Sequence, residues 1–250
     1  MRKNTDFATI IIMIKILIAT TNHGKLAEIK LGLSSLLKKG ISLVTLDEAG
    51  IKDRPEETGK TFEENSKLKA KFYGDMSGLP TIADDGGIII RSLNNEPSVK
   101  SRRWPGYEAS DQELIDYTLH KLKGFPKEKR KAYLETCICF YNPTPRYPEL
   151  VSGSHSKKML NPFDKTQGKQ VQHDKGNNGF YICQQEHIDG TIAEETARNF
   201  SVGYPYRALF IVDAFQKYYD ELTHEEHDRI NHRLRALRKL RIKIEKSLLE

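Results

Sequence analysis

The sequence predicts an α/β fold, and three observations support that class. Segments rich in β-branched and apolar residues alternate along the chain with segments whose apolar residues recur at helical spacing. The 250 residues are enough to bury a sizeable core without a disulfide or a metal. Hydrophobic residues make up 38% and charged residues 30% of the chain, which excludes a disordered, collagen-like or purely coiled-coil protein.

The first 90 residues are expected to alternate between strands and two helices. Apolar, β-branched runs predict strands at residues 14–19 and 41–46. A polar turn at 20–24 leads into a helix at 25–37. Thr61 and Glu64 have the form of a capping box, which starts a second helix ending near Tyr73. Residues 80–90 are interpreted as a strand, an acidic turn and another strand.

Later in the chain, residues 111–122 predict an amphipathic helix, and 132–141 and 180–192 predict strands. Thr223 and Glu226 form another capping box, which starts one long C-terminal helix. Residues 143–178 are rich in Pro, Gly, Ser, Lys and Asn, which indicates a surface insertion or long hairpin. We therefore expect a single domain at 14–250, with residues 1–12 as an N-terminal extension ahead of Met13.

Composition and charge limit the cellular location and the kinds of partner that we expect for this protein. The three cysteines, 137, 139 and 183, form no CxxC pair, so we expect no disulfide framework and a reducing, cytoplasmic environment. The apolar run at 10–19 is interrupted by Lys15 and is too short to cross a bilayer, so no membrane partner is expected. A net charge of +6 favours anionic partners. Basic residues are mixed with acidic ones, which disfavours nucleic acid.

The first cluster of chemically useful residues lies at the predicted strand-to-helix turn. It comprises Thr20, Thr21, Asn22, His23, Gly24 and Lys25. A helix N-terminus presents unpaired backbone N–H groups and a partial positive charge, which together with hydroxyl, amide and ammonium groups suit a phosphate chain. The Walker spacing is absent. An ordinary capped helix start is the alternative interpretation.

The second cluster lies in the expected acidic turn and comprises Asp84, Asp85, Gly86 and Gly87. Adjacent carboxylates repel each other and need a cation or a donor nearby. Oxygen ligands of this kind suit Mg²⁺, and one carboxylate can instead activate water as a general base. A plain Asp-Gly hairpin turn is the alternative.

The third cluster is Asn231, His232 and Arg233, preceded by His227, in the predicted C-terminal helix. Arginine supplies a fixed fork of donors and histidine a switchable one, which suits a phosphate or a purine carbonyl. A solvated basic helix face is the alternative. A metal site at these histidines is disfavoured because the HExxH spacing is absent.

Together these clusters resemble the Ham1/inosine triphosphatase family. ATTNHGK followed by Glu28 matches the family's ATGNxxK opening, EETGKTFEENSKLKA at 56–70 matches EETGxTFxENAxxKA, and GLPTIADDGG at 78–87 matches GLPxxADDSG. SRRWPG at 101–106, GYPYRALF at 203–210 and EEHDRINHRLRAL at 225–237 resemble SARxxG, GFGYDPIF and EEKNxISHRxxAL. Six motifs in the same order are far more specific than any one of them.

The resemblance implies an elongated mixed sheet flanked by helices, with two lobes and a central cleft, and a homodimer. It also implies hydrolysis of non-standard purine nucleoside triphosphates, such as ITP, dITP and XTP, to a monophosphate and pyrophosphate. That reaction removes damaged nucleotides from the pool and uses Mg²⁺ as its cofactor.

The resemblance further assigns roles to residues of this chain. Residues 20–25 would hold the phosphates, Lys69 would assist them as a catalytic residue, and Asp85 would be the general base or a metal-side carboxylate. Glu56 or Glu57 would complete the Mg²⁺ site. Tyr204 would stack on the base, and His232 and Arg233 would donate to the purine 6-oxo group. The remaining substrate-binding positions would be Gly86, Pro205, Tyr206, Arg207 and His227.

The chain departs from the family motifs mainly where the base would be recognised. The replacements are Gly86 for Ser, Pro205 for Gly, Arg207 for Asp, His227 for Lys and Asn231 for Ser. Because the phosphate and metal motifs are nearly intact, we expect retained pyrophosphohydrolase chemistry with an altered choice of base. A catalytically silent or differently specific nucleotide-binding protein is the alternative.

Overall fold

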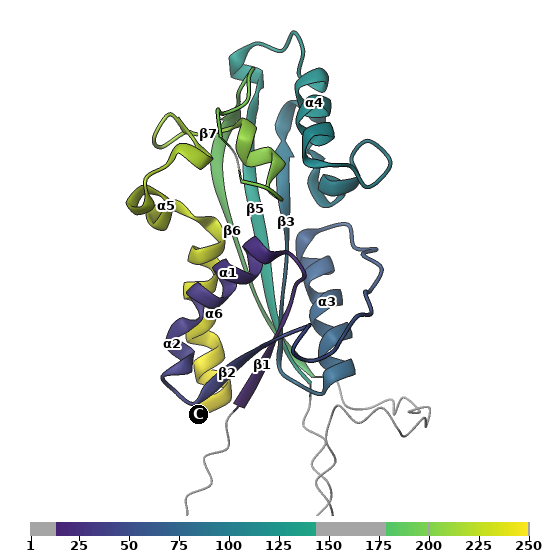
Figure 1. The fold of residues 1–250 in the computed structure, drawn as a ribbon, viewed down its shortest axis with the longest axis vertical. Coiled ribbons are helices and arrows are strands. Elements are labelled where there is room, and N and C mark those ends of the chain that lie inside the picture. Colours follow the sequence, from purple (N-terminus) through teal and green to yellow (C-terminus); the bar gives the residue numbers. More distant parts are fainter. Residues whose placement is uncertain (1–13, 144–178, 200, 250) are drawn as a thin grey trace, which may run out of the picture.

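The computed structural model describes residues 14–143, 179–199 and 201–249. Figure 1 shows an elongated molecule built on a mixed sheet that runs along its long axis, so the predicted fold class is confirmed. The strands are β1 (Ile14–Ala19), β2 (Ile41–Thr45), β3 (Thr81–Ile90), β4 (Glu96–Pro97), β5 (Lys131–Asn142), β6 (Phe180–Ile192), β7 (Phe210–Val212) and β8 (Lys217–Tyr218). The helices are α1 (His23–Gly32), α2 (Ser34–Leu37), α3 (Phe62–Ser77), α4 (Asp111–Lys121), α5 (His224–Ile230) and α6 (His232–Leu249).

The sheet order is β2-β1-β3-β5-β6-β7-β8, with β4 beside β3. β1 pairs in parallel with β2 and β3, whereas β3, β5 and β6 are antiparallel. The parallel pairing of β1 with β3 ends at Ala19 opposite Ala83, and β3 continues to Ile90 alongside β5. A crevice therefore opens beside β3, just beyond the carboxyl end of β1, where ligands bind in many α/β sheets.

The predicted acidic turn at residues 84–87 is wrong, because these residues lie inside the unbroken strand β3. Asp84 faces Ile138 and Asp85 faces Cys137 on β5, and the pairing continues without interruption through both glycines. The Asp-Gly pair favours a turn when it is judged locally. The twelve-residue partner strand β5 overrides that preference by pairing with β3 over its whole length.

Helices cover both faces of the lower part of the sheet (Figure 1). α3 packs on β3 and β5 from one side, while α6 packs on β5 and β6 from the other, with α1 against α6. Buried apolar residues, mostly aliphatic on the α6 side and mixed with aromatic residues and cysteines on the α3 side, fill both layers. In the upper part, α4 packs against the 3₁₀ helix η4 (Pro205–Leu209) over a separate apolar cluster.

Two predicted helices are each divided in two. The first begins at His23, because the Asn22 side chain accepts a hydrogen bond from the Lys25 N–H at 3.0 Å, and it breaks at Leu33 between α1 and α2. The C-terminal helix breaks at Asn231, whose ψ of 110° is not helical. The side chain of Asn231 then caps α6 by accepting from the Leu234 N–H at 3.0 Å.

The predicted capping residues lie where they were expected. The Thr61 hydroxyl accepts from the Glu64 N–H at the start of α3, and Glu64 in turn accepts from the Lys60 N–H at 2.6 Å. Thr223 and Glu226 form a complete capping box at α5. α3 continues to Ser77, four residues beyond the predicted end, and stops at the left-handed Gly78.

The sequence predicted no disulfide framework, whereas the structure joins one pair of cysteines, Cys139 and Cys183. These residues face each other directly in the β5–β6 ladder, a placement that spacing in the sequence does not reveal. Cys137 is free and buried.

The predicted insertion lies almost entirely outside the described residues, but the strands on either side of it, β5 and β6, pair from Asn142 and Phe180 onward. The N-terminal extension at 1–12 also lies outside them. Within the described ranges, no helix is long and apolar enough to cross a membrane.

Candidate active site

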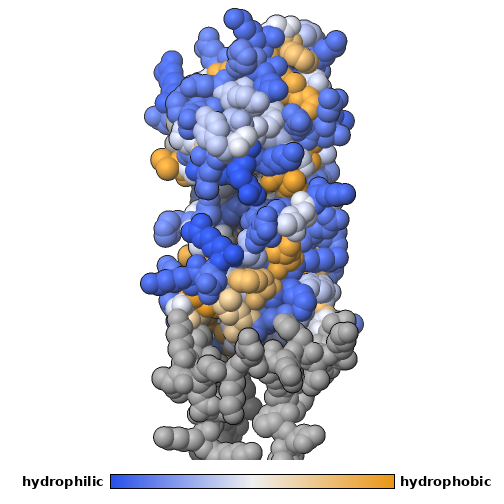
Figure 2. Space-filling model, turned by 90° about the vertical axis from the view of Figure 1, so that its right-hand side faces the viewer, coloured by the Kyte–Doolittle hydropathy of each residue, from blue (hydrophilic) through white to orange (hydrophobic). Residues whose placement is uncertain are grey.

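A cavity of about 410 Å³ lies between the lower and upper parts of the molecule. It is lined by the end of β1 and start of α1, the loop before α3, the middle of β3, the 3₁₀ helix η2 (Ser98–Arg103), residues 203–207 and the start of α6. Figure 2 shows the corresponding face hollowed at mid-height and surrounded mostly by hydrophilic side chains. Segments far apart in the sequence thus form one cleft.

The strand-to-helix turn forms one wall of the cavity. Thr20, Thr21, Asn22 and Lys25 line it, whereas His23 is exposed and outside it. The Thr20 hydroxyl accepts from the Asn22 N–H at 3.2 Å, which fixes the turn ahead of α1. This wall offers the helix N-terminus and one ammonium group to an anion.

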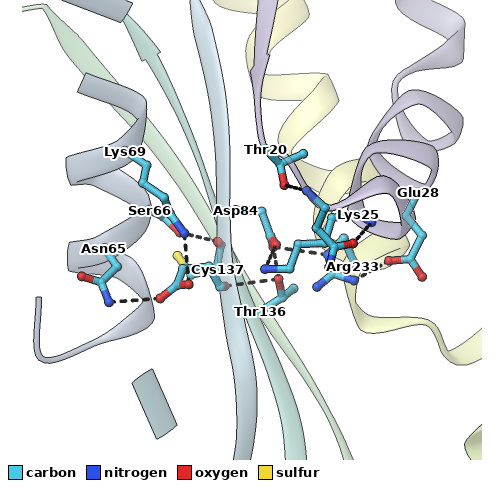
Figure 3. A network of polar contacts seen from close by, with 12 residues as sticks. Thr20, Lys25, Glu28, Asn65, Ser66, Lys69, Asp84, Thr136, Cys137 and Arg233 are labelled. Atoms are coloured by element: carbon cyan, nitrogen blue, oxygen red, sulfur yellow. Dashed lines mark hydrogen bonds and ion pairs between the residues drawn. The ribbon is translucent and has the colours of Figure 1, made fainter. Parts of the chain in front are cut away.

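Asp84 and Asp85 point to opposite faces of the sheet, because side chains alternate along an extended strand. Figure 3 shows Asp84 directed toward Lys25 and Arg233 on the α1 and α6 side, with Lys69 on the α3 side of β3. Asp85 pairs with Lys69. Both carboxylates line the same cavity, which therefore extends to both faces of β3 where β1 ends.

Asp84 is a buried carboxylate held between two cations. Its oxygens lie 2.7 Å from the Lys25 ammonium and 3.3 Å from Nε of Arg233, and the Thr136 hydroxyl donates to it. Burial opposes ionisation of Asp84, but Arg233 and Lys25 outweigh it and hold the pKa well below its usual range. Asp84 is therefore a permanent anion that positions both cations.

Asp85 lies in a different electrostatic environment. It is 3.1 Å from the Lys69 ammonium and accepts from the Asn65 amide at 3.2 Å. Burial raises the pKa of Asp85 above its ordinary value, against the attraction of Lys69 and Lys25, and the nearby Glu57 carboxylate adds to the rise. A buried carboxylate with a raised pKa, located in a cleft, is suited to accepting a proton.

Lys69 joins the two carboxylates on this side, since its ammonium is also 3.2 Å from Glu57. Burial opposes the charge on Lys69, but Asp85 and Glu57 raise its pKa, so it stays protonated. Glu57 lines the cavity, whereas Glu56 is exposed and outside it. Of the two glutamates that the sequence left open, the structure therefore brings only Glu57 to Asp85.

The donor set around Lys69 fits Mg²⁺. Asp85 and Glu57 converge on one cation already, and carboxylate oxygens are the ligands Mg²⁺ prefers. In the described part of the chain, no group of three or more His, Cys, Asp or Glu side chains could hold a metal ion. A magnesium ion here would thus take its remaining ligands from water and substrate phosphates, as is usual for this ion.

Behind the cavity lining at its far end, Glu28 accepts from three donors. It pairs with Arg207 at 3.0 Å and with Arg233, and it accepts from the Asn231 amide at 2.9 Å. Burial opposes ionisation of Glu28, but Arg233 and Arg207 lower its pKa to about 2. The Arg207 guanidinium lies 3.7 Å from the centre of the Tyr204 ring. This network fixes the turn that carries Tyr204.

The two predicted histidines differ in position. His232 lines the cavity and is buried, and burial together with Arg233 and Arg207 lowers its pKa well below the ordinary value, so it is neutral. Among the described residues nothing hydrogen-bonds to its Nδ1. His227 lies outside the cavity, with its ring 5.3 Å from that of Tyr219.

Most of the predicted site residues meet in this cavity, and four do not. Those that line it are Thr20, Thr21, Asn22, Lys25, Glu57, Lys69, Asp85, Gly86, Tyr204, Pro205, Tyr206, Arg207, His232 and Arg233. Those that do not are His23, Gly24, Glu56 and His227. Gly24 lies directly behind Tyr204, since a Cβ at Gly24 would be 2.4 Å from its ring.

Sequence reasoning missed several lining residues. Arg54, Ser101, Arg102 and Arg103 also face the cavity. The last three belong to the SRRWPG motif, so its match to the family was a usable signal. Nothing in the local sequence distinguishes Arg54 from other exposed arginines.

The chain is similar to known proteins over most of its length. The sequence model of the Ham1 family matches residues 16–243. A relative from Bacillus subtilis (strain 168), named dITP/XTP pyrophosphatase, is 33% identical over 92% of this chain and 96% of its own. One from Thermoanaerobacter pseudethanolicus with the same name is 34% identical over 94% of this chain and 99% of its own.

Solved structures resemble the fold as well. A HAM1 protein from Coxiella burnetii superimposes with a TM-score of 0.69 at 29% identity, covering 94% of this chain and all of that one. A nucleoside-triphosphatase, dITP/XTP pyrophosphatase, from Mycobacterium abscessus gives a TM-score of 0.63 at 29% identity, covering 91% of this chain and 98% of that one.

Proposed function

The chain belongs to the Ham1 family, and we propose on that basis that it is a nucleoside triphosphate pyrophosphatase acting on dITP and XTP. Relatives that carry this activity in their names match more than nine-tenths of the chain. The observation that carries the proposal is the cavity itself, which brings Lys25 and Lys69 together with Asp85 and Glu57.

The reaction breaks the bond between the α-phosphorus and the oxygen bridging it to the β-phosphate. The oxygen of a water molecule bonds to the α-phosphorus, and the bridging oxygen leaves with pyrophosphate. In our proposal Asp85 orients this water and accepts its proton, as a carboxylate that lines the cavity can. The hydroxyls of Thr20 and Thr21, the side-chain amide of Asn22 and the Lys25 ammonium hold the phosphate chain.

Mg²⁺, held by Glu57, Asp85 and the phosphates, would supply neutralisation of phosphate charge. Lys69 contributes positive charge from the protein at the same place and keeps the two carboxylates in position. At the other end, Tyr204 stacks on the purine, and Arg233 donates to its 6-oxo group. Neutral His232 donates there too when its proton is on the ring nitrogen that faces the base.

A donor-lined base site favours oxo purines over adenine, because the 6-amino group of adenine would leave those donors unpaired. The exact substrate range and the homodimer stay predictions from the family resemblance, and the cytoplasmic location stays a prediction from the cysteine pattern.

A substrate panel tests the proposal. The full chain is incubated with Mg²⁺ and ITP, dITP, XTP, dXTP or the four standard triphosphates, and pyrophosphate and monophosphate are quantified. We expect release from the inosine and xanthosine nucleotides well above that from the standard set. Binding of nucleotides without any pyrophosphate release would indicate a silent nucleotide-binding protein instead.

A further inference from the structure

Five charged side chains form a continuous chain of ion pairs along one wall of the cavity. Lys25 pairs with Asp84, Asp84 with Arg233, Arg233 with Glu28, and Glu28 with Arg207. These four ion pairs join five groups whose charges alternate in sign. Figure 3 shows the groups from Lys25 through Asp84 and Arg233 to Glu28.

This series of ion pairs begins and ends with a cation, so its five groups together carry one positive charge in excess. Within the described residues, no further carboxylate forms an ion pair with any of the five groups. Removing either end cation, Lys25 or Arg207, would balance the remaining four charges. Of these two, Arg207 is the one at the end of the cavity beside Tyr204, and it is only 8% exposed.

Arg207 lies at the end of the cavity where Tyr204 and His232 also line it. Its guanidinium stacks on Tyr204 and lies 4.6 Å from the centre of the Tyr219 ring. The described residues supply it with one side-chain acceptor, Glu28. A guanidinium has five N–H donors, so Arg207 retains donors for a ligand.

The carboxylate that pairs with Arg207 has no oxygen left for a ligand. Both oxygens of Glu28 are engaged by Arg207, Asn231 and Arg233, so Glu28 is not free to accept from a base N–H. The end of the cavity therefore has an excess of donors and of positive charge.

We propose that Arg207 makes this site selective for xanthine over hypoxanthine, which rests on the proposed function. Xanthine has two carbonyl oxygens where hypoxanthine has one, and it loses a ring proton far more readily to become an anion. Its second carbonyl and its negative charge match the spare donors and the excess cation. Guanine has an amino group at that carbonyl's position, so the same donors oppose it.

The test compares kcat/KM for dXTP, dITP and dGTP in the presence of Mg²⁺. Wild-type protein is expected to prefer dXTP over dITP by about tenfold, the effect of one charge-assisted hydrogen bond. Arg207→Met, which keeps the length and removes the charge, should abolish that preference. Arg207→Lys, which keeps the charge, should still favour dXTP. Arg238→Met is the matched control, because Arg238 pairs on the surface with Asp228, and its preference should equal that of wild type.

Binding of xanthosine and inosine 5′-monophosphate, measured by calorimetry, separates this inference from the proposed function. Tighter binding of the xanthosine nucleotide without turnover of any triphosphate would support the inference and refute the pyrophosphatase. Turnover of dXTP and dITP at equal efficiency would support the pyrophosphatase and overturn the inference. An unchanged preference in a folded Arg207→Met variant would overturn it too. If that variant does not fold by circular dichroism, the wild-type and Arg207→Lys preferences decide.

Discussion

Replacing Asp85 by Asn is expected to lower activity, whereas replacing the adjacent Asp84 by Asn is expected to lower stability. Asp85→Asn removes the proposed proton acceptor, and general acid–base catalysis contributes about 10²- to 10⁴-fold, so kcat should fall by about 10³-fold. Because Lys69 keeps Glu57 as a partner and Asn can still hydrogen-bond to Asn65, the unfolding free energy should change by only about 1 kcal/mol.

Asp84→Asn should instead destabilise the fold. Asp84 is 2% exposed and pairs with Lys25 and Arg233, so its loss leaves buried cations short of a carboxylate. Breaking a buried pair in this way costs about 3–5 kcal/mol. In a chain of this size such a loss lowers Tm by about 10 °C.

The two variants are compared by pyrophosphate release and by thermal denaturation at pH 7. An Asp85→Asn protein that keeps kcat within about tenfold of wild type would remove Asp85 from the catalytic step. An Asp84→Asn protein that melts with the wild type would show that Asp84 does not hold the two cations. Either result would refute the division of roles along β3.

Three further outcomes are expected. Protonation of Glu28 should lower the unfolding free energy by about 3 kcal/mol between pH 4.5 and 2, because folding lowers the pKa of Glu28 from 4.5 to about 2. The ion pairs of Glu28 stabilise the fold at a pH above the pKa of the unfolded state. This stabilisation is lost as the pH falls through the pKa of the folded state. In acid titrations of urea-unfolding free energy, Glu28→Gln should flatten that loss. Gly24→Ala should raise KM with little change in kcat, since its Cβ would lie 2.4 Å from the Tyr204 ring; steady-state kinetics at equal KM would contradict this. EDTA should stop pyrophosphate release and Mg²⁺ restore it, and Glu57→Gln should raise the Mg²⁺ concentration needed, measured by metal titration.

Local patterns predicted most elements because their causes are local. Thr61 and Thr223 begin helices through their own side chains, and apolar spacing marks the buried strands. The division of the C-terminal helix at Asn231 has a different cause. Its Oδ1 caps α6 while its amide donates to Glu28, about two hundred residues away in sequence. Helical periodicity across residues 224–249 carries no sign of that contact.

The candidate site was predicted in its members more than in its geometry. The order of the family motifs predicted that Lys25, Lys69 and Asp85 belong to one site, and all three line the cavity. That Asp84 and Asp85 face opposite sides of the sheet follows from the pairing of β3 with β5, which is long-range. Arg54 reaches the cavity through the loop before α3, and its position depends on the whole fold.

The unbroken course of β3 has a consequence for redesign. One strand serves as a partition, with the alternating charges that end at Arg207 on one side and the Lys69 carboxylate pair on the other. In the proposed function, the residues that would select the purine therefore lie on one face of β3 and the proposed proton acceptor lies on the other, with Lys25 on the first face holding the phosphates. Each face offers its own set of positions for mutagenesis, and the shared backbone keeps the two in register.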